Sequence, residues 1–306
     1  MTVARNEQPS QVNWWRLLAS DPELRFIAYG VRVGLKVVDR RPSPTPTQIL
    51  ARLQRRLPPG AQPLHSHDVD CHYELVIAPR DGSADFGHFS TLYADGMPVA
   101  SAAELDEAAD QFESLVQLNI AEKSRHGLFV HAGVVGWEGQ AIVIPGRSYS
   151  GKTTLVAALV RAGATYYSDE YAVLDGQGYV HPYARLLVMR RPGGSKRRCS
   201  PEELGGMPGS APLPVGLVVI TAYQSGASWN PRRVSAGQGV LGLLANTVAA
   251  RRHPEAAITT LTRTIANAAV LEGVRGEAEE TTVALLDSIV PPNAGAPVIN
   301  TAAEEV

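Results

Sequence analysis

The chain has 306 residues, enough to bury one large core or two modest ones. Its hydrophobic fraction of 44% and charged fraction of 19% are typical of a globular protein in water. A net charge of −2 gives no overall field toward nucleic acid or an anionic membrane, so neither is an expected partner.

The cysteines and the apolar runs predict the compartment. Cys71 and Cys199 lie far apart and form no CxxC pair, which fits a reducing compartment. The first residues contain no apolar segment typical of a signal peptide, and no run reaches the roughly 18 apolar residues of a membrane span. We therefore expect a cytoplasmic protein.

Residues 1–24 are expected to form an N-terminal segment that is polar apart from Trp14–Leu18. This amphipathic piece is predicted to dock on the rest of the chain; a partner-binding anchor is the alternative. Residues 291–306 are polar and alanine-rich, which predicts a disordered tail.

Residues 25–125 are predicted to form a mainly β (α+β) unit. The expected strands are 27–37, 72–77 and 86–100, the last bent at Asp95-Gly96, and the expected helices are a short one capped by Thr47 and a long one over 103–123. His65, His67, Cys71 and His72 fit no closed zinc pattern, so a loop and a strand edge are favoured over a metal site.

Residues 126–290 are predicted to form a second unit. The expected strands are 127–136, 141–144, 164–174, 179–189 and 213–223, with a loop over 191–212. The expected helices are 153–161, Ser235 to Arg252, Glu255 to Leu271 and Glu277 to Ile289. The basic residues 196–198 of the loop are expected to be solvated, and a clamp for a substrate carboxylate is the alternative.

The second unit contains a phosphate-binding pattern. Gly146 and Gly151-Lys152-Thr153 match G-x-x-x-x-G-K-[ST] between an apolar strand and a helical segment. Glycine lets several N–H groups turn toward one polyphosphate, and the helix points its positive end at the same anion. The predicted nucleotide contacts are Gly146, Arg147, Ser148, Tyr149, Ser150, Gly151, Lys152, Thr153 and Thr154. The pattern predicts ATP, with Lys152 on the β- and γ-phosphates and Thr153 on Mg²⁺, or alternatively Mn²⁺.

Two acids follow the expected helix, at Asp169 and Glu170. Phosphoryl transfer needs a metal on the phosphates and a group that orients or deprotonates the acceptor. The acid pair meets both needs, with Asp169 and Thr153 as the predicted metal ligands. Which acid is the base is left open.

His131 lies in the strand before the phosphate loop. A histidine in an apolar strand is more often a core residue, although a hairpin would bring this one near the mouth of the loop.

These segments resemble the catalytic core of the HPr kinase/phosphorylase superfamily. The likeness rests on Val130-His131-Ala132, the loop over 142–155, Arg161–Ala164 and Ser168-Asp169-Glu170, in the family's order and spacing. It covers about residues 126–190 well and 213–290 loosely. It implies an α/β P-loop kinase core of the HPr kinase type, here with the mainly β N-terminal unit before it and the C-terminal helices after it.

The resemblance implies roles for single residues. His131 matches the active-site histidine, and Asp169 with Glu170 matches an Asp-Asp pair that binds metal and acts as base toward the acceptor serine. The chain differs from the family in carrying glutamate at 170 and in lacking the Glu-x-Arg-Gly-Leu-Gly stretch, where only Arg190 and Arg191 stand. In type it is most similar to shorter HPr-kinase-like enzymes that tailor peptides, including lasso peptides.

The expected function is therefore an ATP- and Mg²⁺-dependent kinase that acts on a hydroxyl, serine by preference, of a peptide or small protein. Lys152, His131, Asp169 and Glu170 are its predicted catalytic residues. Two alternatives stay open: a non-catalytic ATP-binding module, and a kinase of a small hydroxyl metabolite such as free serine. The sequence also leaves open whether the chain forms a homo-oligomer.

Overall fold

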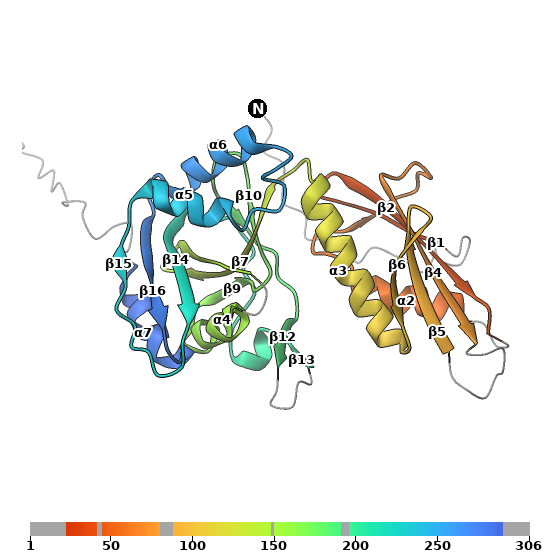
Figure 1. Cartoon of the computed structure of the whole chain (residues 1–306), viewed down its shortest axis with the longest axis horizontal. Helices are drawn as coiled ribbons and strands as arrows, with labels where there is room; N and C mark the ends of the chain where they lie inside the picture. Colours follow the sequence, from red (N-terminus) through yellow and green to blue (C-terminus); the bar gives the residue numbers. More distant parts are fainter. Residues whose placement is uncertain (1–22, 42–44, 80–87, 148–149, 191–195, 290–306) are drawn as a thin grey trace, which may run out of the picture. The chain divides into compact units, whose positions relative to one another are not determined.

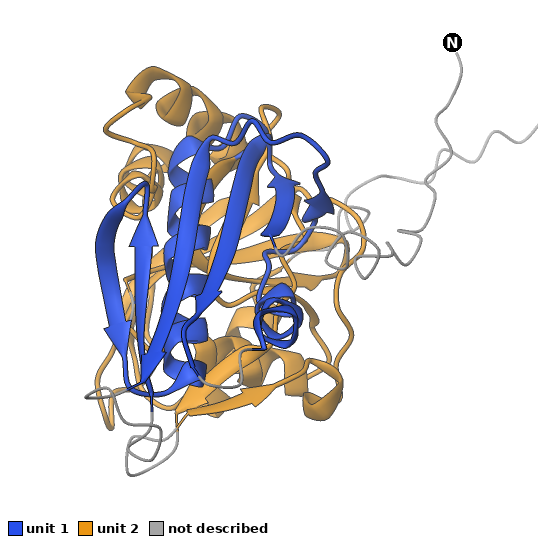
Figure 2. Cartoon of the chain, turned by 90° about the vertical axis from the view of Figure 1, so that its right-hand side faces the viewer, with its two compact units in different colours: residues 1–127 blue, residues 128–306 orange. Residues whose placement is uncertain are grey.

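The computed structural model describes residues 23–41, 45–79, 88–147, 150–190 and 196–289. It divides into two compact units, Met1–Gly127 and Leu128–Val306, coloured separately in Figure 2. The predicted segment 1–24, except for its last two residues, and the predicted tail 291–306 lie outside the described residues. No helix in the described ranges combines the length and the apolar character needed to cross a membrane.

Unit 1 contains a mixed six-stranded sheet in the order β3-β1-β2-β4-β5-β6. Its strands are β1 (Glu23–Ala28), β2 (Val31–Asp39), β3 (Gln62–Pro63), β4 (Cys71–Pro79), β5 (His88–Ala94) and β6 (Met97–Ala102). Helices α2 (Pro46–Gln54) and α3 (Leu105–Lys123) cover one face of this sheet (Figure 2). Arg56 of the turn after α2 pairs with Asp110 and Glu113 of α3, which ties the two helices together.

Two expectations for unit 1 are confirmed. Asp95 and Gly96 both have positive φ and join β5 to β6 as a tight hairpin. The long helix α3 buries the predicted apolar stripe, with Phe112, Val116 and Ile120 fully inaccessible.

Two other expectations for unit 1 are wrong. The alternating run over 27–37 is a hairpin of two strands, because Tyr29 and Gly30 take positive φ and turn the chain so that Ala28 pairs with Val31. The apolar alternation continues across this two-residue turn and therefore hides it. The short helix α2 begins at Pro46, one residue before the expected cap, since proline suits the first helical position.

Three of the four residues weighed as a metal site in unit 1 have other neighbours. His67 Nδ1 lies 2.7 Å from an Arg25 nitrogen, and Cys71 Sγ lies 3.0 Å from Lys123 Nζ. His72 Nε2 lies 3.7 Å from a Glu23 oxygen. Among the described residues, no group of three or more histidine, cysteine, aspartate or glutamate side chains is placed to hold a metal ion.

Unit 2 is built on a mixed eight-stranded sheet, shown in Figure 1. The order is β11-β10-β7-β8-β14-β16-β15, and β9 pairs with β7. Its strands are β7 (Leu128–Trp137), β8 (Gln140–Pro145), β9 (Thr165–Ser168), β10 (Tyr171–Leu174), β11 (Val180–His181), β14 (Val215–Tyr223), β15 (Arg232–Arg233) and β16 (Ala269–Arg275). The central strands β8, β14 and β16 are parallel, so their carboxyl ends lie at one edge of the sheet.

Two hydrophobic clusters lie on the two faces of this sheet. Leu217 and Val219 of β14 belong to one cluster, and Val218 between them belongs to the other, as strand alternation requires. The helices are α4 (Lys152–Arg161), α5 (Ala236–Leu244), α6 (Pro254–Ile265) and α7 (Ala278–Asp287). Helices α4 and α7 contribute to the first cluster, and α5 and α6 to the second; each pair lies together in Figure 1.

The predicted strand over 164–174 is wrong as a single element. It is interrupted at Asp169-Glu170, and β9 and β10 pair with different parts of β7. The Ser168 hydroxyl accepts the amide protons of Glu170 and Tyr171 at 3.1 and 2.9 Å, which takes these donors away from the sheet. The acid pair therefore lies in a turn between two strands.

The next expected strand and loop also differ. Residues 179–189 give only β11 and the start of β12 (Leu187–Arg190), because Pro182 has no amide donor for a sheet. Within the expected loop 191–212, residues 196–199 form β13 (Lys196–Cys199) against β12, and a 3₁₀ turn (Glu202–Leu204) follows. Residues 191–195 lie outside the described residues.

The C-terminal region holds fewer helical residues than predicted. Ser235 caps α5 in a capping box with Gln238, as expected, but the helix ends at Leu244 instead of Arg252. The Asn246 carbonyl and the Val248 amide leave the helix to pair with β7. The second expected helix ends at Ile265, and its last three predicted residues, 269–271, begin the parallel strand β16. An apolar run of this length fits a buried strand as well as a helix.

The chain is thus a mixed α/β protein with mixed sheets in both units. In unit 2, the turn after β8 and the turn between β9 and β10 both lie beside β7. The predicted site residues that the structure describes lie in these two turns, at the start of α4 and, for His131, in β7 itself.

Candidate functional site

The segment from Gly146 to Thr153 joins β8 to α4, which is the strand–turn–helix setting that a phosphate-binding loop requires. Gly151 is the N-cap of α4 and has φ of 81°, in the left-handed region that favours glycine. A Cβ at Gly146 would come within 2.7 Å of the Ser150 hydroxyl, so the loop is also compact at its first glycine. The N-terminus of α4 is the kind of helix end that binds anions.

The other predicted nucleotide contacts differ in their exposure, and two of them lie outside the described residues. Ser148 and Tyr149 lie outside the described residues. Arg147 and Thr154 are exposed, and Ser150 is half-buried, with its amide donating to the Arg147 carbonyl at 3.2 Å. The described part of the loop therefore curls back on itself before the helix starts.

Lys152 points its ammonium group into this loop. Its Nζ donates to the carbonyls of Gly146 at 2.7 Å and Arg147 at 2.9 Å. Burial lowers the pKa of Lys152, and the nearby carboxylates of Glu170 and Asp169 oppose that shift. The loop thus holds a partly desolvated cation where a phosphate oxygen would replace the carbonyls.

Close packing brings α4 against β7. A Cβ at Gly133 of β7 would come within 2.5 Å of Val156 Cγ2 and 3.8 Å of Lys152 Cβ. Only glycine therefore allows the first turn of α4 to approach β7 this closely. The approach sets the loop beside His131, whose carbonyl accepts the Gly146 amide at 3.1 Å.

Asp169 is held by two hydroxyl groups. Thr153 Oγ1 donates to one carboxylate oxygen at 3.0 Å, and the Tyr166 hydroxyl donates to the other at 2.9 Å. Only 8% of Asp169 is exposed, and Tyr166 is fully buried. Burial raises the pKa of Tyr166, and the Asp169 carboxylate adds to the rise, so the phenol stays protonated and remains a donor.

The two predicted metal ligands, Thr153 and Asp169, are thus adjacent although they are 16 residues apart in sequence. A hydroxyl and a carboxylate are hard oxygen donors of the kind that Mg²⁺ prefers. Magnesium usually takes one or two carboxylates from the protein and completes its shell with phosphate oxygens and water. The residues present therefore fit a magnesium ion that is shared with bound phosphates.

His131 and Glu170 form the other side of the site. His131 Nδ1 lies 3.7 Å from Glu170 Oε1, and the imidazole stacks on Tyr171 at 4.6 Å between ring centroids. The His131 amide donates to the Asn246 carbonyl at 2.8 Å, which anchors the histidine to the segment after α5. The Glu170 side chain is 42% exposed, so this acid faces solvent while Asp169 faces the loop.

Burial lowers the pKa of His131, and the positive charge of Lys152 lowers it further. The imidazole is therefore neutral at physiological pH and can accept a proton. The folded chain binds this proton less readily than the unfolded chain does. Protonation of His131 should therefore lower the free energy of unfolding as the pH falls from about 6.5 through the folded-state pKa.

This shift can be measured by NMR. The His131 imidazole resonance, assigned by its loss in His131→Gln, should titrate with a pKa below the ordinary 6.5, since burial and Lys152 both disfavour the imidazolium. The pKa should rise in Lys152→Met, where the neighbouring cation is gone. A His131 pKa at or above 6.5 in the wild-type chain would contradict the described surroundings.

Three residues of the site had no signal in the sequence. Tyr166 lies in an apolar strand, a position that predicts a core residue. Asn246 lies in a segment predicted to be helical, and Arg275 lies beyond the end of an expected helix. Arg275 ends β16, and its Nη2 donates to the Gly151 carbonyl at 3.0 Å. The strand would have had to be predicted before this contact could be inferred.

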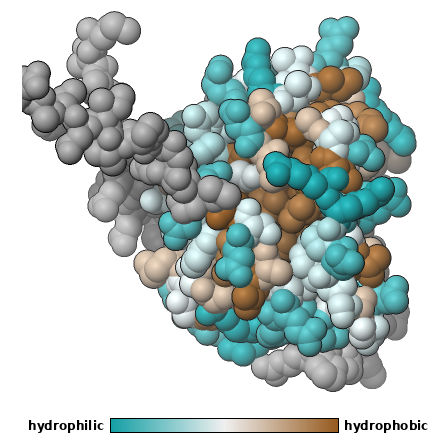
Figure 3. Space-filling model, turned by 90° about the vertical axis from the view of Figure 1, so that its left-hand side faces the viewer, coloured by the Kyte–Doolittle hydropathy of each residue, from teal (hydrophilic) through white to brown (hydrophobic). Residues whose placement is uncertain are grey.

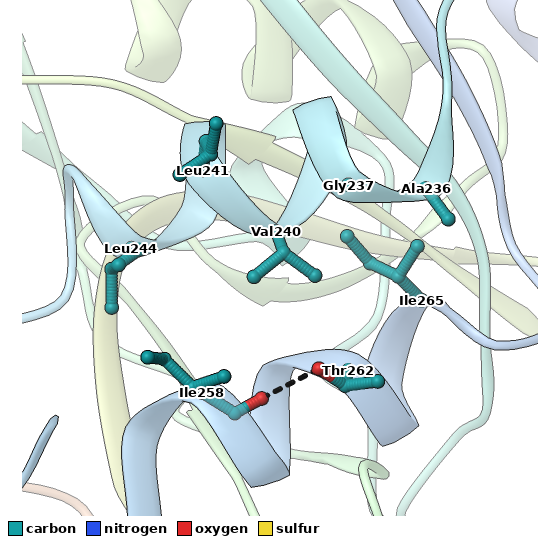
Figure 4. Close-up of a pocket in the computed structure, with 8 residues that line it drawn as sticks. All are labelled: Ala236, Gly237, Val240, Leu241, Leu244, Ile258, Thr262 and Ile265. Carbon is teal, nitrogen blue, oxygen red and sulfur yellow. Dashed lines mark hydrogen bonds between the residues drawn. The ribbon is translucent and has the colours of Figure 1, made fainter. Parts of the chain in front are cut away.

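A separate apolar pocket of about 340 Å³ lies between α5 and α6 (Figure 4). Eight residues line it, none of them charged: Ala236, Gly237, Val240, Leu241, Leu244, Ile258, Thr262 and Ile265. Leu241 and Ile258 are 64% and 46% exposed, and Figure 3 shows hydrophobic side chains gathered on one face of the molecule. None of the pocket residues belongs to the phosphate loop or the acid pair.

Comparison with known proteins adds no assignment. No protein-family model matches the chain. A search of curated proteins finds no match of significance.

Proposed function

We propose that this chain is an ATP- and Mg²⁺-dependent kinase that transfers the γ-phosphoryl group to a hydroxyl, by preference serine, of a peptide or small protein. The observation that carries the proposal is the 3.0 Å contact between the Thr153 hydroxyl and the Asp169 carboxylate beside Lys152. This contact joins a helix end of the kind that binds phosphate to an acid of the kind that holds a metal, which is one of the two things that phosphoryl transfer requires; Glu170 is proposed to supply the other. The proposal includes membership of the HPr-kinase-like group that the sequence resembles.

The loop and helix α4 bind the triphosphate. The amides at the N-terminus of α4 and the Lys152 ammonium contact phosphate oxygens, with the Gly146 and Arg147 carbonyls released from Lys152. Thr153 and Asp169 would hold magnesium, which would supply positive charge to neutralise the phosphates. Tyr166 keeps Asp169 oriented by its hydrogen bond.

The two acids take different roles in this proposal. Both oxygens of Asp169 accept hydrogen bonds from Thr153 and Tyr166, which suits a fixed metal ligand. Glu170 is more exposed and lies beside a neutral His131, which suits the base. As the acceptor oxygen bonds to the γ-phosphorus and the bond to ADP breaks, the hydroxyl proton passes to Glu170. His131, whose Nδ1 lies 3.7 Å from that carboxylate, assists this proton transfer.

The test measures phosphoryl transfer by the full chain. Labelled ATP and Mg²⁺ are supplied with a peptide pool that has one serine between randomised residues, with the same pool carrying alanine there, or with free serine. We expect label in the serine pool and none in the alanine pool. Label in free serine alone would favour a metabolite kinase. Nucleotide binding without label in any acceptor would contradict the kinase assignment and favour an ATP-binding module.

A further inference from the structure

Arg275 lies at the carboxyl edge of the parallel strands, where β16 ends. It is paired in register with Tyr223, the last residue of β14, and only 2% of it is exposed. Its Nη1 donates to the Gly276 carbonyl and its Nη2 to the Gly151 carbonyl, each at 3.0 Å. A strand far along the chain thus holds the N-cap of α4.

The Arg275 guanidinium is a buried cation without an acid in ion-pair contact among the described residues. Its Nε has no hydrogen-bond partner, and its remaining neighbour is the Tyr223 ring, 5.3 Å away. The negative charge of Glu277 acts on Arg275 from a distance, but the Glu277 carboxylate accepts its hydrogen bond from the Tyr223 hydroxyl at 2.9 Å and forms no ion pair with the guanidinium. Guanidinium cannot lose its proton in a protein, so the charge stays and its burial is unfavourable unless an anion balances it.

The same guanidinium also packs on the phosphate loop. A Cβ at Gly151 would come within 2.4 Å of Arg275 Nη2, so glycine is needed there for the arginine as well as for its positive φ. Arg275, Lys152 and the positive end of α4 therefore converge on one turn. Three positive features in one place favour a polyanion over any neutral ligand.

We propose that Arg275 is a positioning residue of the nucleotide site. It fixes the Gly151 peptide so that the first turn of α4 keeps its phosphate-binding conformation, and it adds a permanent positive charge behind the loop. The inference rests on the proposed function, since it takes the phosphates of ATP as the anion that balances the guanidinium.

The test is calorimetry of the full chain with MgATP. Arg275→Met keeps the length of the side chain but removes both carbonyl bonds and the charge, and we expect the Kd for MgATP to rise about 10- to 100-fold. Arg275→Lys keeps the charge, and its Kd for MgATP is expected to lie between those of the wild type and Arg275→Met. Arg233→Met, which alters an exposed arginine of β15 in the same unit, should bind like the wild type.

A comparison of MgATP with AMP distinguishes an effect of the Arg275 charge on the phosphates from a general role of Arg275 in folding. The loss of affinity in Arg275→Met should be larger for MgATP than for AMP, because the fixed charge acts on the phosphate chain. An equal loss for both ligands, or MgATP affinity within twofold of wild type, would overturn the inference. If Arg275→Met does not fold, Arg275→Lys decides, and wild-type affinity in that variant would overturn it. Failure of the wild-type chain to bind MgATP would instead contradict the proposed function, and this inference would fall with it.

Discussion

Replacing Asp169 with asparagine should lower the rate of phosphoryl transfer by about 10²- to 10³-fold, the loss typical when one electrostatic contact to the transition state is removed. The change keeps the size of the side chain and removes the negative charge that we propose holds magnesium. One amide oxygen can still accept from Thr153 or from Tyr166, but not from both in the present geometry. The defect should therefore appear in the metal-dependent step.

The readout is the initial rate of label transfer to the serine pool, together with ATP affinity in the presence of a chelator. We expect the rate to fall and the metal-free affinity to stay within about threefold of wild type. Asp287→Asn, at the exposed end of α7, is the matched control and should change neither quantity. A rate for Asp169→Asn close to that of the control would remove Asp169 from the metal site.

Replacing Lys152 with alanine should weaken MgATP binding by about 10- to 100-fold, since each hydrogen bond to a charged group contributes about 1.5–3 kcal/mol. In the described structure this ammonium is held by two loop carbonyls, which are weaker partners for a cation than phosphate oxygens. Alanine favours the helix, so α4 should remain formed.

The matched control for this change is Arg161→Ala, which removes a cation from the exposed last turn of the same helix. Calorimetry should show the full loss in Lys152→Ala and none in Arg161→Ala. Equal nucleotide affinities for both variants would place the phosphates somewhere other than the loop.

Local patterns in the sequence predicted the loop but not all of its supports. The phosphate-binding pattern is contiguous, and its strand and helix have clear apolar periodicity, so β8 and α4 could be placed from sequence. The sequence predicted Thr153 and Asp169 as ligands of one metal ion, and the structure brings their two side chains together. Long-range pairings such as that of Arg275 with Gly151 leave no mark in a local pattern.

Three of the wrong elements of unit 2 have one of two physical causes. Around Ser168 and Asn246, short polar side chains bond to nearby main-chain groups and end a strand or a helix that apolar periodicity alone would continue. In β16, pairing with β14 determines the structure of an apolar run that is also compatible with a helix. Both misjudged breaks border the candidate site, where the chain must leave regular structure to present polar groups.

Gly146, Gly151, Lys152 and Thr153, with Asp169 and Arg275, are proposed to form a nucleoside triphosphate site. The most direct test is calorimetric titration of the wild-type full chain with MgATP, followed by the same titration with the magnesium chelated. We predict saturable binding of a single nucleotide per chain that weakens when the metal is removed, because Thr153 and Asp169 would then hold no cation to offset the charge of the phosphates. No heat of binding at millimolar nucleotide, or an affinity indifferent to magnesium, would contradict the account.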